Sequence, residues 1–379
     1  MSTGSPPASE AFLNPAPVSR ADLPDGSPVW LVTRYTDVRA LLADPRLSVN
    51  KSNGNGSWSG FSLPPALDAN LLNMDPPDHT RIRRLVSQAF TPRRVENLRP
   101  RIQETADALL DELAGQDEAD LVRDYAGPLP VAVISDLLGV PEPDRNDFRS
   151  WTDAMVSPPA RDRAAAGRAV FTIHAYLEKL LAAKRTDPAD DLLSALIAAR
   201  DDGDRLTEDE LTSLAFLLLL AGYENTVHAI GTSLFTLLRE SAFPPDPAHL
   251  GSTIEELLRF EPPAPVVLRR FPTEDVDVAG VVVPRGETVL LVVAAANRDP
   301  EAFPASDEVR PGRPGAHLSF GHGIHYCLAA PLARVELEVA VGTVARRFPR
   351  MRLATPAGEV RWRPSFRTRG LVALPVTLG

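Results

Sequence analysis

Helical periodicity dominates the pattern of hydrophobic and polar positions along the chain. Apolar residues recur at spacings of three and four, which places them on one face of an α-helix. The pattern predicts helices at residues 35–42, 77–113 with a break at Thr91-Pro92, 128–138, 142–155, 162–185, 190–200, 207–240, 251–260 and 328–347. Because no linker divides these segments, we expect residues 1–379 to form a single large, mainly α-helical domain, with 1–25 as a poorly structured N-terminal segment.

The pattern changes between Val276 and Ala296, where apolar and polar residues alternate and valine is frequent. This alternation, with a turn at Pro284-Arg285-Gly286, predicts short β-strands. A loop of about twenty residues follows, and loops of that length inside a compact domain are usually functional. Further short strands are expected around 360–362 and 371–376, so the fold includes a minor β region.

The helix predicted at 207–240 is long and has an unusual centre. It begins with a capping box formed by Thr207 and Glu210, and at about 1.5 Å per residue it could cross the whole molecule. Its middle is apolar all round, which predicts burial, yet the segment Ala221-Gly-Tyr-Glu-Asn-Thr226 places a glycine and an acid there. Such conflicts are typical of functional sites. The alternative is a close helix crossing at the glycine and a glutamate with a buried partner.

Composition and charge narrow the class of protein. The chain has 379 residues, of which 44% are hydrophobic and 24% charged, and a formal net charge of −10. These values exclude a mostly disordered chain and argue against general nucleic-acid binding. The first residues contain no apolar stretch, and the most apolar run, Leu214–Tyr223, is shorter than the roughly twenty residues that a membrane-spanning helix needs. We therefore expect a soluble, cytoplasmic protein without a membrane or nucleic-acid partner.

The single cysteine, Cys327, ends the string Phe320-Gly-His-Gly-Ile-His-Tyr-Cys327 and precedes a predicted helix. A thiolate at a helix N-terminus is stabilised by the helix dipole and by unpaired backbone N–H groups, and glycines let a flat ligand approach the loop closely. These features suit an anionic sulfur ligand to iron. Two alternatives stay open on the cysteine alone: a buried structural cysteine, which is the commoner role, and a catalytic thiol activated by His325.

The whole string resembles the haem-binding loop of the cytochrome P-450 superfamily, Phe-Gly-x-Gly-x-His-x-Cys-x-Gly, at every position except the last. The resemblance implies the cytochrome P-450 fold, with the long helix lying over a haem b group. It implies Cys327 as the axial ligand of the haem iron and His325 as the partner of a haem propionate. In this superfamily the thiolate ligand favours cleavage of the O–O bond. The other haem-lining residues that it implies are Phe320, Gly321 and Ala329, which replaces the last glycine.

A second motif, Asp75-Pro-Pro-Asp-His79-Thr-Arg-Ile-Arg83, contains two basic side chains one helical turn apart. They share a helix face and suit a carboxylate, although by themselves they would indicate a solvated basic face. The segment resembles the superfamily's Asp-Pro-Pro-x-His-x-x-x-Arg element, which implies that His79 and Arg83 bind the haem propionates. The resemblance gives Arg270 the same role, and the neighbouring Arg269 leaves the register open.

Glu256 and Arg259 have the spacing Glu-x-x-Arg, which allows an ion pair on one face of a helix. Such pairs are also common on surface helices. Arg313 follows in Val309-Arg-Pro-Gly-Arg313, and the two segments together resemble the superfamily's Glu-x-x-Arg and Phe-x-Pro-x-Arg elements. The implied role is structural: a buried charge network that positions the cysteine loop.

The centre of the long helix resembles the superfamily's oxygen-activation motif, Ala/Gly-Gly-x-Asp/Glu-Thr. The resemblance implies that Ala221 and Gly222 leave room for O2 and that Glu224 relays protons from solvent. Asn225 stands where threonine is usual, and Thr226 is about 100° further round the helix, so it cannot simply replace that threonine. The Asn225 amide, a water molecule or a hydroxyl of the substrate could then assist proton delivery.

The resemblance as a whole implies a monooxygenase that inserts one oxygen atom of O2 into a C–H bond or alkene of a small apolar, polyketide-like natural product of secondary metabolism. The chain has no appended flavin or iron–sulfur region, so electrons from NAD(P)H would arrive through a ferredoxin and a ferredoxin reductase. We expect a monomer. Two other functions stay open: another haem-thiolate reaction, such as oxidative ring closure or peroxide-driven oxidation, and a non-catalytic haem-binding sensor.

Two surfaces follow from the superfamily's architecture. One is an apolar lining near the substrate, whose members could equally be core residues: Leu72, Leu217, Leu220, Ala221, Val266 and Val267. The other is a basic patch for docking the electron donor, which could equally be solubilising surface charge: Arg84, Arg93, Arg94, Arg346 and Arg347.

Overall fold

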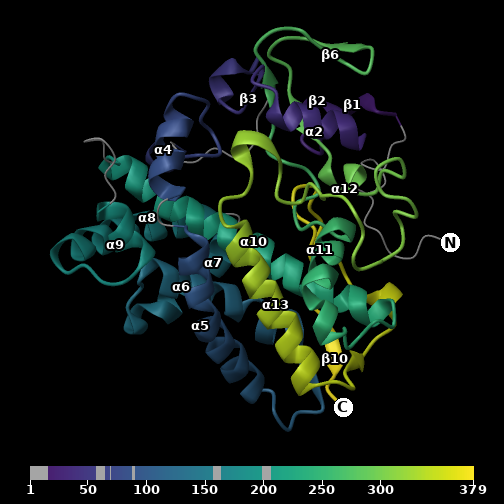
Figure 1. The fold of residues 1–379 in the computed structure, drawn as a ribbon. Coiled ribbons are helices and arrows are strands. Elements are labelled where there is room, and N and C mark those ends of the chain that lie inside the picture. The colour runs from purple at the N-terminus through teal and green to yellow at the C-terminus, as the bar shows by residue number, and fades with distance from the viewer. Residues whose placement is uncertain (1–15, 57–64, 69, 88–89, 157–163, 199–205) are drawn as a thin grey trace.

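Helices form most of the structure, a computed structural model that describes residues 16–56, 65–68, 70–87, 90–156, 164–198 and 206–379 (Figure 1). The helices are α2 (Tyr35–Ala43), α3 (Pro65–Asp68), α4 (Asp78–Ser87), α5 (Pro92–Asp111), α6 (Pro128–Leu138), α7 (Arg145–Val156), α8 (Ala165–Thr186), α9 (Leu192–Ala198), α10 (Glu208–Arg239), α11 (Leu250–Phe260), α12 (Val293–Ala296) and α13 (Ala330–Arg347). Each helix predicted from the hydrophobic pattern is present. The predicted break also occurs, because Thr91 caps α5 by accepting a hydrogen bond from the Arg94 N–H, and Pro92 occupies the first turn.

Short strands form small sheets beside the helices. The strands are β1 (Val18–Asp22), β2 (Pro28–Val32), β3 (Leu47–Ser48), β4 (Glu118–Asp120), β5 (Phe271–Pro272), β6 (Val276–Val278), β7 (Val281–Val283), β8 (Val289–Leu291), β9 (Arg352–Leu353) and β10 (Pro375–Thr377). β2 pairs antiparallel with β1 and parallel with β8, so that Trp30 lies opposite Val289. β10 pairs with β4 and β9 near the C-terminus. The predicted fold class, mainly α with a minor β region, is confirmed.

Three segments differ from the predicted pattern. Residues 18–22, assigned to a poorly structured N-terminal segment, form β1 because β2 provides a pairing edge. Residues 293–296, expected to be strand, form α12, in which three consecutive alanines favour helix. Near the C-terminus the expected strands reduce to β10 and a bridge between Trp362 and Leu371. There, strand pairing depends on a partner that is distant in sequence, since β10 pairs with β4, and a local pattern does not contain such a contact.

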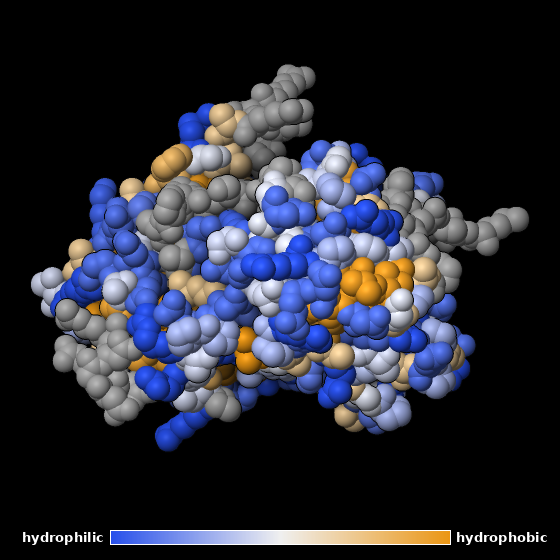
Figure 2. Space-filling model, turned by 90° about the horizontal axis from the view of Figure 1, so that it is seen from above, coloured by the Kyte–Doolittle hydropathy of each residue, from blue (hydrophilic) through white to orange (hydrophobic). Residues whose placement is uncertain are grey.

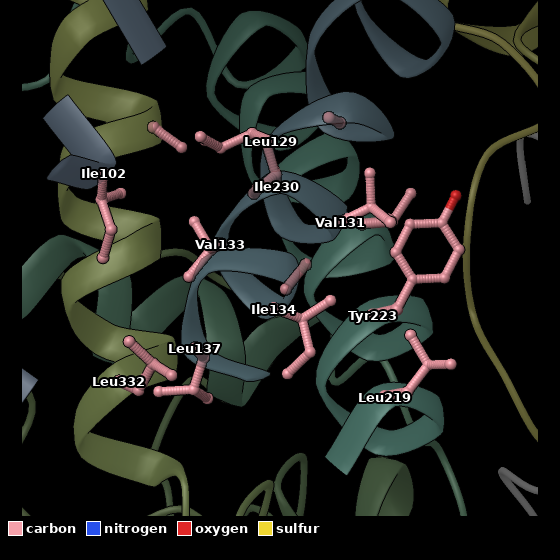
Figure 3. Close-up of a cluster of buried hydrophobic side chains, with 14 of the residues drawn as sticks. Ile102, Leu129, Val131, Val133, Ile134, Leu137, Leu219, Tyr223, Ile230 and Leu332 are labelled. Atoms are coloured by element: carbon pink, nitrogen blue, oxygen red, sulfur yellow. The ribbon is translucent and has the colours of Figure 1, made fainter. Parts of the chain in front are cut away.

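The core is centred on α10, which packs against α3, α6, α8 and α13 (Figure 1). The predicted capping box is present at its N-terminus. Figure 3 shows Leu219 and Tyr223 of α10 beside Val131 and Ile134 of α6, all of them buried. Burial of one such aliphatic side chain contributes about 1.5–3 kcal/mol, so this packing fixes α10 firmly along its length.

Burial distinguishes α10 from a membrane-spanning helix. By length and composition α10 could cross a membrane, but 67% of its most apolar stretch is buried inside the structure, as in the core helix of a globular protein. The face shown in Figure 2 is mostly hydrophilic, with separate hydrophobic patches. Among the described residues, the large hydrophobic side chains that are exposed are Phe171, Leu268, Val281, Val282, Ile324, Tyr326 and Val372. Two of these, Ile324 and Tyr326, belong to the cysteine loop.

Candidate active site

Cys327 lies between the short 3₁₀ turn Gly323–His325 and the start of α13. Its backbone N–H donates to the Phe320 carbonyl oxygen at 2.8 Å, which closes the loop. The backbone N–H groups of Ala329 and Ala330, at the start of α13, act on its sulfur in the direction that lowers the pKa of the thiol. No side chain caps α13, whose N-cap residue is Ala329, so Cys327 stands just before the helix begins.

The electrostatics of Cys327 suit a metal-bound thiolate. Burial raises the pKa of the thiol, whereas the two N–H donors and the charges of Arg83 and Arg334 act to lower it. A metal ion on the sulfur would replace the proton and supply the missing positive charge. Among the described residues, no group of three or more His, Cys, Asp and Glu side chains could hold a metal ion. The arrangement therefore fits an iron whose other ligands come from a cofactor.

Two glycines shape the loop before Cys327. Gly321 and Gly323 have φ values of +74° and +72°, which favour glycine. A Cβ at Gly323 would also lie 2.9 Å from the Leu42 carbonyl oxygen at the end of α2. A Cβ at Gly321 would make only ordinary contacts. Backbone conformation therefore requires glycine at both positions, and close packing on α2 requires it again at Gly323.

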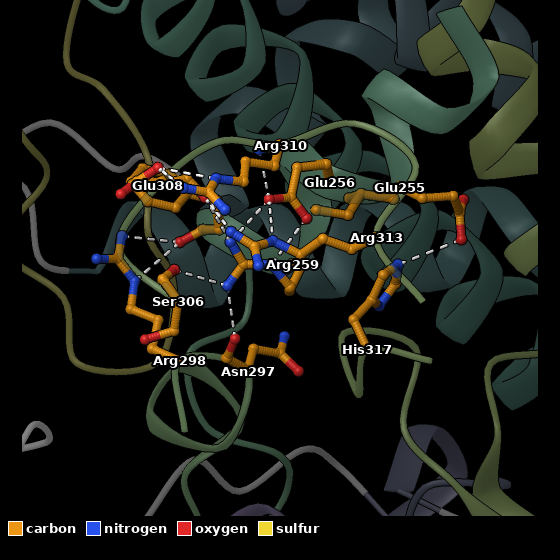
Figure 4. A network of polar contacts seen from close by, with 12 residues as sticks. Glu255, Glu256, Arg259, Asn297, Arg298, Ser306, Glu308, Arg310, Arg313 and His317 are labelled. Carbon is orange, nitrogen blue, oxygen red and sulfur yellow. Dashed lines mark hydrogen bonds and ion pairs between the residues drawn. The ribbon is translucent and has the colours of Figure 1, made fainter. Parts of the chain in front are cut away.

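Glu256, Arg259 and Arg313 form one buried network (Figure 4). Arg259 donates to both oxygens of Glu256 at 2.8 and 2.9 Å, and Arg313 donates to the same carboxylate at 2.9 Å. Burial acts to raise the pKa of Glu256, but the hydrogen bonds from Arg259, the Arg310 backbone and Arg313 outweigh it and lower the pKa. The carbonyl oxygens that accept from Arg259 belong to Asn297, Ser306 and Glu308. The network thus ties α11 to the long loop that precedes Cys327.

A second anchor of the cysteine loop was missed at the sequence level. Arg334 donates to both oxygens of Glu255 at 2.7 and 2.9 Å, and its guanidinium lies 4.5 Å from the centre of the Phe320 ring. His317 Nε2 is 3.4 Å from the same carboxylate. Burial acts to raise the pKa of Glu255, but His317 and Arg334 outweigh it and lower the pKa to about 2. Arg334 lies on α13 and Glu255 on α11, 79 residues apart in the sequence, so no local spacing indicated this pair.

The residues assigned to the haem propionates come together from α4, the segment before β5 and the cysteine loop. They are His79, Arg83, Arg270 and His325. The rings of His79 and His325 are 4.3 Å apart between centres, and neither ring nitrogen of the buried His79 has a hydrogen-bond partner among the described residues. Arg83 donates to the Tyr326 carbonyl oxygen at 2.6 Å. Arg270 donates to a carbonyl of its own segment.

This cluster has more donors than acceptors. Burial lowers the pKa of His325 to about 3, with further lowering by the charges of Arg270 and His79. Burial also lowers the pKa of Arg270 to about 10, against the attraction of Asp75. Asp75 itself accepts hydrogen bonds from the Ser48 hydroxyl and the Val49 N–H. Two carboxylates placed here would satisfy the buried donors, so the residues fit the propionates of a haem.

The structure also decides between the two neighbouring arginines. Arg270 is among the charges that act on His325, and Arg269 is not. Arg269 donates to the Asn73 side-chain oxygen at 2.9 Å, and its guanidinium is 6.0 Å from the Phe271 ring centre. Arg270 is therefore the member of the donor cluster.

The centre of α10 is open on one side. Ala221 is exposed, although Leu219 and Tyr223 on either side of it in the sequence are buried. A Cβ at Gly222 would instead lie 3.3 Å from Ile134 of α6. The missing side chain of Gly222 thus allows close packing on α6. Ala221 is the exposed member of the pair, and the O2 role predicted for both residues stays a prediction.

The polar residues beyond Ala221 are held in different ways. Asn225 Nδ2 donates to the Ala221 carbonyl oxygen at a long 3.4 Å. Thr226 is buried and its hydroxyl donates to the Gly222 carbonyl oxygen at 2.7 Å, so it is not free to replace the usual threonine. Glu224 Oε1 lies 3.6 Å from His228 Nε2. Local helix geometry made the position of Thr226 predictable, whereas the Glu224–His228 contact was missed.

The predicted substrate residues divide between core and partly open positions. Leu217 is buried in the main core, and Val266 is buried in a cluster beside β2 and β8. These two favour the core interpretation. Leu72, Leu220 and Val267 are half-buried, and Ala221 is exposed.

Two of the arginines in the predicted basic patch are paired with acids. Arg346 pairs with Asp107 at 3.3 Å, and Arg347 pairs with Asp111 at 2.6 Å. These acids of α5 neutralise the two arginines of α13. The exposed arginines at the other end of the predicted patch are Arg84, Arg93 and Arg94.

Comparisons with known proteins agree with this geometry. Residues 249–368 match the family model described as cytochrome P-450. The chain is 46% identical over 369 residues to the cytochrome P-450 monooxygenase PikC of Streptomyces venezuelae, covering 95% of this chain and 88% of that protein. It is 43% identical to the mycinamicin IV hydroxylase/epoxidase of Micromonospora griseorubida, over 95% of this chain and 92% of that protein. The solved structure of the Bacillus subtilis bacillaene polyketide synthase cytochrome P-450 PksS superposes with a TM-score of 0.91 at 38% identity, over 98% and 97% of the two chains. The chain therefore belongs to the cytochrome P-450 family and is a haem-thiolate monooxygenase.

Proposed function

We propose that this enzyme oxidises a small apolar natural product of polyketide type, by hydroxylation or epoxidation, in bacterial secondary metabolism. The observation that carries the chemistry is the donor cluster beside Cys327, in which His79 and Arg270 are buried and Arg83 and His325 half-buried. The names of two similar proteins, one for mycinamicin IV and one for a bacillaene polyketide synthase, support the substrate class.

In this proposal the chain would hold the haem at its iron and at its two propionates. Cys327 binds the iron, and the four-residue donor cluster binds the propionates. Bound haem supplies the reductive activation of O2. The chain's own contribution would be the fixed cysteine loop, which supplies Cys327, and the open side of α10 at Ala221, where the substrate would exclude water.

Proton delivery is assigned to α10. Glu224 would hold and release a proton beside Ala221, because it is the acid of this open turn of the helix and its side chain is 26% exposed. Asn225 lies one residue further on, with only a long hydrogen bond to Ala221. Its amide can therefore turn towards the open side, where it would orient a water molecule or the substrate.

Electrons would come from NAD(P)H through a ferredoxin and a ferredoxin reductase in the cytoplasm, with the enzyme acting as a monomer. Arg84, Arg93 and Arg94 are the residues proposed to receive the ferredoxin, since they are exposed on a chain of net charge −10. Such docking should weaken as salt rises. Reversal of charge at Arg93 and Arg94 that leaves the reduction rate unchanged would remove this part of the proposal.

The central test is spectroscopic. The reduced carbon-monoxide complex should show the Soret band of a thiolate-bound haem, and Cys327→Ser should lose it. A variant that kept the band would overturn the assignment of the iron ligand. Screening macrolides and other polyketides for displacement of haem-bound water, read as a Soret shift, would then identify the substrate class. A shift with unrelated compounds and none with polyketides would contradict that class.

A second candidate, oxidative ring closure or peroxide-driven oxidation, rests on Asn225 in place of the usual threonine. Product formed in proportion to NAD(P)H would support monooxygenation. Product formed with peroxide alone, at a rate similar to the NAD(P)H-driven rate, would favour the alternative. A non-catalytic sensor would bind ligands but resist reduction by electron donors.

A further inference from the structure

His228 lies one helical turn beyond Glu224 on α10, so the two side chains share a face. His228 Nε2 is 3.6 Å from Glu224 Oε1, and the exposed fractions of the two side chains are 4% and 26%. This nitrogen has no hydrogen-bond partner among the described residues. A buried polar atom without a partner is rare, and here it faces a carboxylate that reaches more open space.

Gly370 makes room for the imidazole. A Cβ at this position would overlap the His228 ring at Nδ1. The φ angle of Gly370 lies outside the left-handed range, so backbone conformation does not require glycine there. The Arg363 N–H donates to the Gly370 carbonyl oxygen at 2.8 Å, and the Arg369 N–H donates to the Pro263 carbonyl oxygen at 2.8 Å. The backbone of this segment is therefore fixed close to the His228 ring. The ring leaves no room for a side chain, which explains why residue 370 is glycine.

Neighbouring charged groups are engaged elsewhere. Arg369, next to Gly370 in the sequence, pairs with Glu261 and lies 3.9 Å from the Trp362 ring centre. Tyr223, next to Glu224, donates to Asp153. Within the described part of the chain, Glu224 is therefore the acid paired with His228.

We propose that His228 is the residue that returns a proton to Glu224 after each proton release, so that the proton path runs along α10. In the step, imidazolium His228 transfers its Nε2 proton to Oε1 of the Glu224 carboxylate, giving a neutral imidazole and a carboxylic acid. Glu224 then releases its proton towards the open side at Ala221, and between turnovers a proton from water returns to Nε2 of the neutral imidazole through the partly exposed Glu224 carboxylate. No electron moves. His228 acts through Glu224, and the inference rests on the proton role proposed for Glu224.

The contact can be tested without turnover. In ¹⁵N-histidine NMR spectra of the holoenzyme, the His228 signal is the one that His228→Gln removes. Glu224→Gln should move this signal, and the matched surface change Asp246→Asn should not, because Asp246 pairs with exposed His249 at 2.9 Å instead. A His228 signal that is indifferent to Glu224→Gln would overturn the inference.

Measurements of turnover then distinguish a proton relay from a purely structural contact. With a surrogate ferredoxin and reductase, and with the compound that gives the largest Soret shift as the probe, His228→Gln should lower product per NAD(P)H about tenfold and enlarge the solvent isotope effect. Gly370→Ala should do the same more weakly by displacing the ring. His249→Gln should change neither quantity. Haem content, probe affinity and melting temperature should stay at wild-type values in His228→Gln.

The double variant decides how the two residues are connected. If they form one path, Glu224→Ala with His228→Gln should be no slower than Glu224→Ala alone. Loss of coupling in Glu224→Ala with normal coupling in His228→Gln would overturn this inference and leave the role of Glu224 intact. Normal coupling in both single variants would overturn the role of Glu224 as well.

Discussion

The cysteine loop and the centre of α10 represent two ways of building a site. The loop is fixed from several sides: Glu256 binds three partners, Glu255 binds two, and Gly323 is packed against α2. The centre of α10 has a firm apolar back but loosely held polar groups. Asn225 makes one long hydrogen bond, and His228 Nε2 makes none with the described residues.

In the proposed function, the rigid cysteine loop would hold the cofactor, and the loosely held polar groups of α10 would serve its reaction. A ligand and its counter-charges must keep one geometry, and buried, fully satisfied networks supply that rigidity. Groups that pass protons must break and remake hydrogen bonds, so they need weaker partners. Perturbing the loop should therefore change stability and haem retention, whereas perturbing α10 should change the fate of electrons and protons.

The largest effect is expected at Glu256. Glu256→Gln would leave the charges of Arg259 and Arg313 buried without a counter-charge, which typically costs about 3–5 kcal/mol of unfolding free energy. Urea unfolding and haem content measure this loss. Glu308→Gln is the control, since its pair with Arg310 is exposed and worth about 0–1 kcal/mol. Equal losses in the two variants would show that the buried network does not stabilise the loop.

The next largest effect is expected on the stability of the haem-free protein in acid. The pKa of His325 is about 3 in the folded chain against an ordinary 6.5, so between these values the unfolded chain binds a proton that the folded chain does not. Stability present above pH 6.5 should therefore be lost as pH falls towards 3, by up to about 1.4 kcal/mol per unit. His325→Gln should flatten this slope in urea unfolding series. Replacement of the exposed His249 by glutamine should leave the slope unchanged. An unchanged slope in His325→Gln would show that the pKa of His325 is not lowered in the folded chain.

Much of the cysteine loop could be predicted because its chemistry lies in one continuous string. Cys327, the proposed ligand, its glycines and the helix that follows are neighbours in sequence. The pair Glu256–Arg259 follows from helical spacing in the same way. The helices themselves were predictable because each carries its own apolar face, whereas β10 at the C-terminus pairs with β4, which is distant in the sequence.

The rest of the site depends on contacts between distant segments. Glu255 and Arg334 are 79 residues apart, and Arg270 reaches His325 across a comparable distance in sequence. The motif at Gly222 gave no sign that Ile134 of α6 lies 3.3 Å from the place of its missing Cβ. The contact of Gly370 with His228 likewise has no local signal. Composition and periodicity do not contain such information.

A smaller loss of stability is expected at Gly323. Gly323→Ala would force an alanine to φ +72° and bring its Cβ within 2.9 Å of the Leu42 carbonyl oxygen, which should cost about 1–3 kcal/mol. Gly312→Ala is a matched control, because its φ is +80° but nothing lies within 4 Å of the added Cβ. Thermal unfolding should therefore rank Gly323→Ala below Gly312→Ala. The reverse order would mean that the contact with α2 is not tight.

The smallest effect on stability, and the most informative one for chemistry, is expected at Asn225. The side chain is anchored only to the Ala221 carbonyl oxygen, so Asn225→Thr should leave the unfolding free energy almost unchanged. If a hydroxyl of the native substrate assists proton delivery, analogues without that hydroxyl should bind but release reducing equivalents as peroxide. A threonine hydroxyl would then replace the missing group.

Coupling, measured as product per NAD(P)H, decides between the two roles of Asn225. Under substrate assistance, Asn225→Thr should raise coupling for the analogues more than for the native substrate, and Glu224→Ala should slow both, because proton entry precedes either route. Positioned proton transfer is worth about 10²–10⁴ in rate, so the difference is measurable. If instead the Asn225 amide already does the work of the hydroxyl, native substrate and analogues should couple equally, and Asn225→Thr should change neither. That result would remove substrate assistance and leave the open side of α10 with a complete proton path of its own.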